Sequence, residues 1–158
     1  MVGETRWLRV RLPIRPNGST GWLRSDSVDV KALRHRIIIN QRRHRLTLLR
    51  DGKTVRSTRV VLGAPKTPTP KGTFAVLEVV RQPKGAVIGP WALHLTAHST
   101  VLDNYGGGPG RVALHGRSGS LLNDPLGSDR SHGCIRMPNA FITMLHDVAT
   151  EGTPVEIR

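Results

Sequence analysis

Glycine and proline interrupt this sequence so often that long helices have little room to form. The 158 residues include 17 glycines and 11 prolines, and both residue types mark turns and end regular elements. Aromatic residues make up only 4% of the chain, so the core must rest on valine, leucine and isoleucine. We therefore expect a mainly β fold, in a chain long enough for one domain plus a fragment.

Short apolar runs between turn signals predict a series of strands. Residues 7–28 indicate a β-hairpin, with the strong turn pair Asn17-Gly18 between its strands. Further strands are expected at residues 37–39, 45–49, 54–62, 73–80, 91–95, 111–114 and 153–157. The prolines of residues 67–72 exclude that segment from regular structure, because proline lacks an N–H and fixes φ. Seven or eight strands indicate a β-sandwich or β-barrel.

One segment near the C-terminus has helical periodicity. Its apolar residues recur at i, i+3, i+4 and i+7, and they are Phe141, Met144, Leu145 and Val148. Pro138 suits the first turn and Gly152 suits the end of such a helix. We therefore predict a single accessory helix over about residues 139–150.

The chain is strongly basic, with a formal net charge of +13. Such a surface attracts polyanions, among them nucleic acid, anionic cell-wall polymers and membranes, or it only keeps the protein in solution. No basic helix with interleaved aromatic residues and no zinc-finger spacing is present, so nucleic acid is not favoured. No apolar run approaches the length of a membrane span, and residues 1–12 lack the apolar region of a signal peptide. The opening of the chain suggests that the native protein is longer.

The chain has a single cysteine, Cys134, so an intramolecular disulfide is excluded. A lone cysteine is either a small buried residue or a reactive thiol. Cys134 follows Ser131-His132-Gly133 in a tight glycine-containing turn that we place just before the helix. Such a turn exposes a side chain and directs backbone N–H groups to one point, so the N–H groups of Gly133 and Cys134 are candidate oxyanion donors.

Thiol catalysis also needs a base, because an unperturbed cysteine carries little thiolate at neutral pH. His115 closes an apolar strand, so a rigid element can hold it. A histidine at a strand end can equally serve only to bond the backbone. Zinc bound by Cys134, His132, His115 and His98 is a further reading, but these residues lack the paired spacing of structural zinc sites.

Taken together, these segments resemble the L,D-transpeptidase catalytic domain, also called the YkuD domain. The resemblance rests on His115-Gly116, a 14-residue gap, and then Ser131-His132-Gly133-Cys134. Three upstream segments are also similar to that family, namely residues 63–74 (GAPKTPTPKGTF), 89–93 and 105–108. The resemblance covers about residues 36–158. It implies that residues 31–158 form the catalytic domain, whereas the hairpin of residues 1–30 resembles the end of a bacterial SH3-like module.

The resemblance implies a two-step acyl transfer on peptidoglycan stem peptides, without a metal or cofactor. Cys134 would form a thioester with a tetrapeptide stem, and the amine of another stem's diamino acid would resolve it into a 3→3 cross-link. His115 would be the base, oriented by the backbone carbonyl of Gly116. The residues implied to bind substrate are Ser131, His132, Arg136, Tyr105 and Asn123. Arg136 can alternatively pair with a local aspartate.

Three rival functions are compatible with the residues. Water in place of the amine gives an L,D-carboxypeptidase, and a sortase also pairs cysteine with histidine but expects a different stretch before the cysteine. A non-catalytic, basic cell-wall-binding module would leave the His115 and Cys134 pair unexplained. The resemblance places the protein outside the cytoplasm, in the cell wall or periplasm. The glycine-rich residues 105–110 are expected to be mobile and to border a cleft at Cys134.

Overall fold

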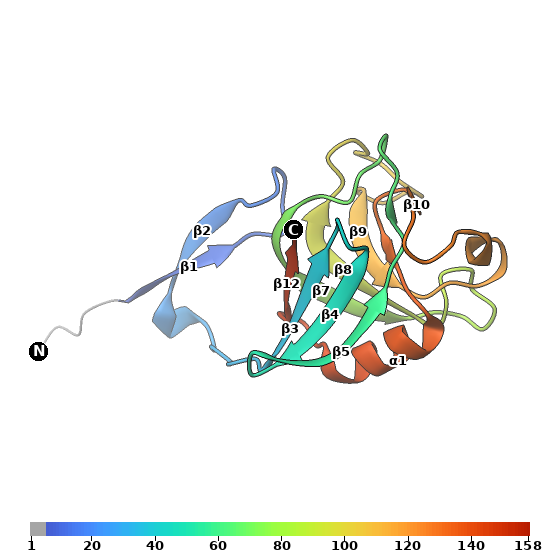
Figure 1. Cartoon of the computed structure of the whole chain (residues 1–158). Coiled ribbons are helices and arrows are strands. Elements are labelled where there is room, and N and C mark those ends of the chain that lie inside the picture. The colour runs from blue at the N-terminus through green and yellow to red at the C-terminus, as the bar shows by residue number, and fades with distance from the viewer. Residues whose placement is uncertain (1–5) are drawn as a thin grey trace, which may run out of the picture.

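The computed structural model describes residues 6–158 and consists mainly of strands around one core (Figure 1). Eight strands form a single curled sheet in the order β11-β9-β8-β7-β12-β3-β4-β5. Their bounds are β3 His35–Asn40, β4 Arg45–Arg50, β5 Lys53–Arg59, β7 Gly72–Arg81, β8 Trp91–His98, β9 Arg111–His115, β11 Ile135–Arg136 and β12 Pro154–Ile157. The mainly β fold predicted from the sequence is confirmed.

Two smaller sheets accompany the large one. Strands β1 (Trp7–Arg11) and β2 (Thr20–Arg24) form an antiparallel hairpin, and β6 (Leu62–Gly63) pairs in parallel with β10 (Asp129–Ser131). Two 3-10 helices, η1 (Ser25–Ser27) and η2 (Gly119–Asn123), lie in connecting segments. The predicted hairpin is therefore present, whereas its origin in an SH3-like module stays a prediction.

The helix α1 (Asn139–Val148) packs against β8 and β9 and ends two residues earlier than predicted. Its buried side chains are Phe141, Ile142 and Leu145, and they join a core of valine, leucine and isoleucine from nearly every strand of the large sheet. The apolar stripe read from the sequence is the face of α1 that covers this core.

The predicted strand at residues 54–62 is wrong as one element. β5 ends at Arg59, and Val60 and Val61 then leave the sheet edge and enter the core, where both are fully buried. Val61 bridges to Arg136, and β6 pairs with β10 instead of continuing beside β4. The sequence could not show this break, because the apolar residues 60–62 have the same pattern whether they continue a strand or pass from one sheet to another.

Two further boundaries differ near the cysteine. The expected turn does not lead directly into the helix, because β11 and Pro138 lie between Cys134 and α1. The segment between His115 and Cys134, expected to be only a loop, contains η2 and β10. Both differences follow from elements of two to five residues, which are too short to show a period.

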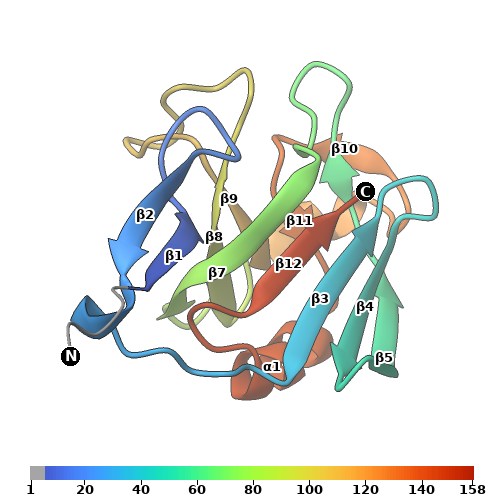
Figure 2. The same ribbon diagram turned by 90° about the vertical axis from the view of Figure 1, so that its left-hand side faces the viewer.

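The turn of the hairpin lies beside the segment between β8 and β9 and is hydrogen-bonded to it (Figure 2). Arg15 donates hydrogen bonds to the carbonyls of Ser99 (2.6 Å) and Leu102 (2.9 Å). Asn17 exchanges two hydrogen bonds with the backbone of His98, at 2.7 and 2.9 Å. The hairpin turn is therefore fastened to the segment between β8 and β9.

No helix of the described residues is long and apolar enough to cross a membrane.

Candidate active site

Parallel pairing of β11 with β9 brings the cysteine to the histidine. Ile135 lies opposite Leu114, and Arg136 lies opposite His115. Continuing this register by one residue places Cys134 beside Ala113. Neighbouring strands are about 4.8 Å apart, so the thiol lies one strand away from Ala113 and two residues along β9 from His115. The long sequence gap between the two residues is closed by β10, β11 and the segments around them.

Cys134 and His115 line one cleft of about 650 Å³. The walls come from β7, β8, β9, the turn before β11 and the glycine-rich loop. The cleft residues are Glu78, Val87, Ile88, Ala92, His94, Tyr105, Gly106, Gly108, Pro109, Arg111, Ala113, His115, Leu121, His132, Cys134 and Arg136. The predicted cleft between residues 105–110 and Cys134 is therefore present, and the mobility of that loop stays a prediction.

The imidazole of His115 is buried and fixed in orientation. Its side chain closes β9, the residue is 5% exposed, and Nδ1 donates to the carbonyl of Gly116 at 2.7 Å. A carbonyl only accepts, so Nδ1 carries the proton and Nε2 of the neutral ring is left as an acceptor. The hydrogen bond expected between His115 and Gly116 is thus present.

Burial lowers the pKa of His115 from 6.5 to about 4, and the nearby Arg136 and His94 act in the same direction. Hydrogen bonds with the backbone of Gly116 and Ile88 oppose this shift but do not cancel it. Desolvation disfavours the charged imidazolium. The ring is consequently neutral at physiological pH, which is the state in which it can take a proton from a thiol.

The thiol of Cys134 is partly exposed in the cleft. Burial raises its pKa above the ordinary value, while a hydrogen bond from the backbone N–H of Ala113 and the charge of Arg136 lower it. The thiol and the imidazole are therefore both neutral at rest. The Ala113 N–H and the Arg136 guanidinium favour the thiolate form of Cys134, whereas the Gly116 carbonyl favours the charged form of His115.

Ser131 builds the turn that presents the cysteine. Its hydroxyl donates to the carbonyl of Cys134 at 2.5 Å and accepts from the N–H of Gly133 at 3.1 Å. Thr69 holds the same turn by donating to the carbonyl of Gly133, and Gly133 has φ +111°, a conformation that favours glycine. Ser131 is 1% exposed and lies outside the cleft wall. Because the N–H of Gly133 is bonded to Ser131, the N–H of Cys134 is the stronger oxyanion candidate.

The other expected substrate residues separate into two groups. Tyr105 and His132 both line the cleft, with the Tyr105 hydroxyl 3.4 Å from Nδ1 of His132. Asn123 ends η2, is exposed, and is not part of the cleft wall. Arg136 touches the cleft but forms an ion pair with Asp124. Of the two roles expected for Arg136, the structure therefore shows the pairing with a local aspartate.

Gly116 and Gly89 have no side chain, so the side chain of Asn139 can lie close to their backbone at the end of β9. A Cβ on Gly116 would lie 2.2 Å from Oδ1 of Asn139, and one on Gly89 would lie 2.5 Å from the same atom. That oxygen accepts the N–H of Arg117 at 2.8 Å. The first residue of α1 thus holds the segment that carries the orienting carbonyl for His115.

Three polar cleft residues were not identified from the sequence, namely Glu78, His94 and Arg111. Glu78 pairs with His94 across β7 and β8, and His94 pairs with Ala113 across β8 and β9. These residues therefore form a row across the sheet that leads to Cys134. The available signal was strand alternation, since Arg111, Ala113 and His115 must share one face.

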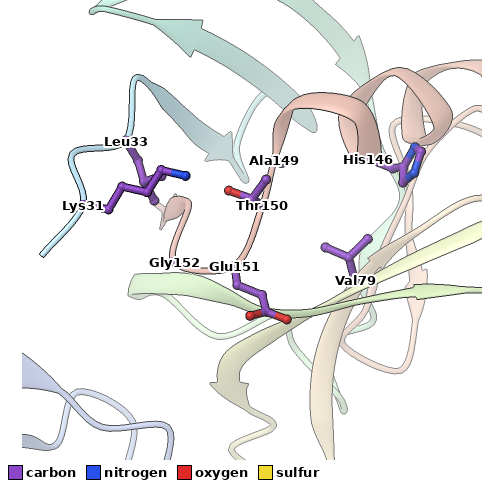
Figure 3. Close-up of a pocket in the computed structure, with 8 residues that line it drawn as sticks. All are labelled: Lys31, Leu33, Val79, His146, Ala149, Thr150, Glu151 and Gly152. Carbon is purple, nitrogen blue, oxygen red and sulfur yellow. The ribbon is translucent and has the colours of Figure 1, made fainter. Parts of the chain in front are cut away.

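A second cavity, of about 600 Å³, lies at the C-terminal end of α1 (Figure 3). It is lined by Lys31, Leu33, Val79, His146, Ala149, Thr150, Glu151 and Gly152, and it shares no residue with the first cleft. His146 stacks on Trp91 with ring centroids 3.5 Å apart. Without a thiol, this cavity lacks the nucleophile that the first cleft contains. Across residues 6–158, no group of three or more His, Cys, Asp or Glu side chains is arranged to hold a metal ion.

A thiol and a neutral, oriented imidazole in one cleft define the class of site that carries out nucleophilic thiol chemistry. Residues 34–157 match the L,D-transpeptidase catalytic domain, YkuD, and the chain belongs to this family. Proteins of the family act on peptidoglycan stem peptides. No sequence among the curated proteins matches the chain.

Solved structures share the fold. An L,D-transpeptidase from Mycobacterium smegmatis has a TM-score of 0.62 at 19% identity, over 98% of this chain and 77% of that one. L,D-transpeptidase 3 from Mycobacterium tuberculosis, in complex with a faropenem-derived adduct, has a TM-score of 0.60 at 19% identity, over 79% of this chain and 60% of that one. A mutant L,D-transpeptidase from Enterococcus faecium has a TM-score of 0.56 at 22% identity, over 78% of this chain and 49% of that one. The chain thus spans about half the length of the E. faecium protein.

Proposed function

We propose that this chain is a cysteine-dependent L,D-transpeptidase that forms 3→3 cross-links between peptidoglycan stems. The observation that carries the proposal is the shared cleft of Cys134 and His115, in which the imidazole is neutral and fixed by Gly116. Family membership adds the substrate class. The cleft thus contains a candidate nucleophile and a candidate base, and the family indicates a stem peptide as the substrate.

The first half-reaction converts the stem into a thioester. Nε2 of His115 takes the proton of the Cys134 thiol, and the sulfur attacks the carbonyl of the third stem residue. The N–H of Cys134 stabilises the oxyanion of the tetrahedral intermediate. The intermediate collapses as the C–N bond breaks, and His115 gives its proton to the departing amine of the terminal D-alanine.

The second half-reaction transfers the acyl group. The side-chain amine of a second stem's diamino acid attacks the thioester carbonyl, and His115 accepts a proton from that amine. The C–S bond breaks, an amide forms, and the proton returns to the sulfur. Since both half-reactions pass one proton through His115, the ring must alternate between its neutral and charged forms.

The proposed setting is outside the cytoplasm, where stems occur. The basic charge of the chain, +13, is suited to the anionic polymers of a cell wall. Such polymers would concentrate the enzyme at its substrate without taking part in the reaction.

The test is turnover of a tetrapeptide stem whose diamino-acid side-chain amine is acetylated, with and without a second stem that carries a free amine, followed by mass spectrometry. Cross-linked dimer is the expected product, with D-alanine released in equal amount. Release of D-alanine without dimer, at saturating acceptor, would show that water is the acceptor and that the chain is an L,D-carboxypeptidase. A folded Cys134→Ala variant that retains turnover would refute the mechanism.

A matched pair of histidine variants tests the base. His115→Gln is expected to slow acylation by at least about 10², the lower end for loss of a general base. His132→Asn is the control, because His132 lies in the same cleft but contacts Tyr105 and belongs to the turn of Cys134. The larger loss in the His132 variant would reverse the assignment.

A further inference from the structure

Arg111 occupies a defined place relative to the reacting groups. It begins β9, and the side chains of Arg111, Ala113 and His115 all line the cleft. Two residues along a strand span about 6.6 Å. Because Cys134 lies beside Ala113, the sulfur stands between His115 on one side and Arg111 on the other.

Within residues 6–158, the guanidinium of Arg111 has a carbonyl partner but no anionic partner. One nitrogen, Nη2, donates to the carbonyl of Pro13 in the hairpin turn at 3.3 Å. The other, Nη1, is buried and has no hydrogen-bond partner within residues 6–158. Over the same residues Arg111 forms no ion pair, whereas the second arginine of the cleft, Arg136, is neutralised by Asp124.

An unpaired cation in a partly enclosed cleft is costly unless a ligand completes it. The positive charge already acts on its surroundings. The pKa of His98 is lowered mainly by burial, and the charge of Arg111 lowers it further. A carboxylate is the partner that matches a guanidinium best, because its two oxygens accept parallel hydrogen bonds.

The proposed reaction fixes which part of the stem reaches Arg111. His115 must protonate the departing amine, so the leaving D-alanine lies on the His115 side of the sulfur. The acyl part of the stem, which stays on Cys134 as the thioester, then extends to the opposite side. That side is the one occupied by Arg111, Tyr105 and the glycine-rich loop.

We propose that Arg111 binds a free carboxylate on the acyl part of the donor stem and so selects stems in which that carboxylate is not amidated. The inference rests on the proposed function. Two stem carboxylates supply the same chemistry, one on the diamino acid and one on the residue before it. The hairpin contributes by holding Nη2 of Arg111 through Pro13, which fixes the guanidinium at the cleft wall.

The experiment uses three synthetic tetrapeptide donors and the full chain. One donor has both carboxylates free, and each of the others has one carboxylate replaced by a carboxamide. The rate and concentration dependence of thioester formation are followed by intact mass. We expect the free donor to acylate the wild type about tenfold or more faster at low concentration than one of the amides, as for a hydrogen bond to a charged group.

Arg111→Gln should reduce that preference to less than about twofold, and Arg111→Lys should retain part of it. The control Arg56→Gln, on β5 at the far edge of the sheet, should keep the wild-type preference. Each donor rate is divided by the rate with iodoacetamide, which has no carboxylate, so that a change in thiol reactivity is not counted as a change in preference. A merely structural role of Arg111 would slow the free and amidated donors equally.

Two results overturn the inference in distinguishable ways. Equal rates for free and amidated donors in the wild type would refute the carboxylate site while leaving the L,D-transpeptidase proposal intact. An absence of thioester with every donor would refute the proposed function as well.

Discussion

The neutral state of buried His115 has a consequence for stability that is independent of catalysis. Its pKa is lowered from 6.5 to about 4 in the folded protein because burial disfavours the imidazolium. The unfolded chain therefore binds a proton more readily than the folded one. As the pH falls from about 6.5 towards 4, His115 increasingly favours unfolding. Above about 6.5 the residue makes no pH-dependent contribution.

The size of the effect follows from the two pKa values. A difference between 6.5 and about 4 corresponds to roughly 3 kcal/mol once the pH is below both values, at about 1.4 kcal/mol per pH unit. At pH 5 the loss is about 2 kcal/mol, because most of the interval has been crossed. A loss of this size is a large part of the stability of a small domain.

The assay is urea unfolding of the wild type and of His115→Gln at pH 7.5 and pH 5. Gln cannot titrate, so the variant should lose about 2 kcal/mol less than the wild type between these pH values. His98, whose pKa is also lowered by burial, is present in both proteins and cancels in the comparison. Equal losses in the two proteins would show that His115 is not held neutral by burial and would refute the electrostatic account of the site.

Other predictions concern the segments around the cleft. Replacing Gly107 and Gly108 with Ala should slow acylation by peptide stems more than by iodoacetamide, and equal slowing would show that the loop does not act on the substrate. Arg15→Ala removes the hydrogen bonds from the hairpin turn to the loop segment, so amide exchange should accelerate in residues 99–110; unchanged exchange would mean that the hairpin does not order the loop. Gly116→Ala should cost about 1–3 kcal/mol in urea unfolding, since its Cβ would overlap a side-chain oxygen, and a neutral effect would refute the tight packing behind β9.

The parts of the fold that repeat a period were predictable from the sequence. The stripe of Phe141 and Leu145 on the helix reflects burial on one face, which the sequence records directly, and the apolar runs of β3 and β4 marked those strands although only alternate residues are fully buried. The break after Arg59 was not predictable, because Val60 and Val61 are apolar whichever sheet they enter. Short elements such as β6, β10 and β11 depend on partners far along the chain.

The site divides in the same way. His115, Cys134 and the Gly116 carbonyl stand in short, ordered motifs, so their proximity was expected. Glu78, His94 and Arg111 belong to ordinary strands and reach the cleft only because β7, β8 and β9 are neighbours. For Ser131, which the resemblance implied to bind substrate, the structure shows the hydroxyl bonded inside the turn, and a substrate contact stays a prediction.

The central claim is that Cys134 forms a thioester with a peptidoglycan stem. The most direct measurement is intact-mass analysis after incubation with a tetrapeptide donor whose own diamino-acid side-chain amine is acetylated, so that no acceptor amine is present, followed by peptide mapping of the adduct. The account predicts a mass gain equal to the stem without its terminal D-alanine, located on Cys134 and absent in Cys134→Ala. A wild-type protein that releases D-alanine while the adduct is on another residue, or one that never releases D-alanine and gains no mass, would contradict it.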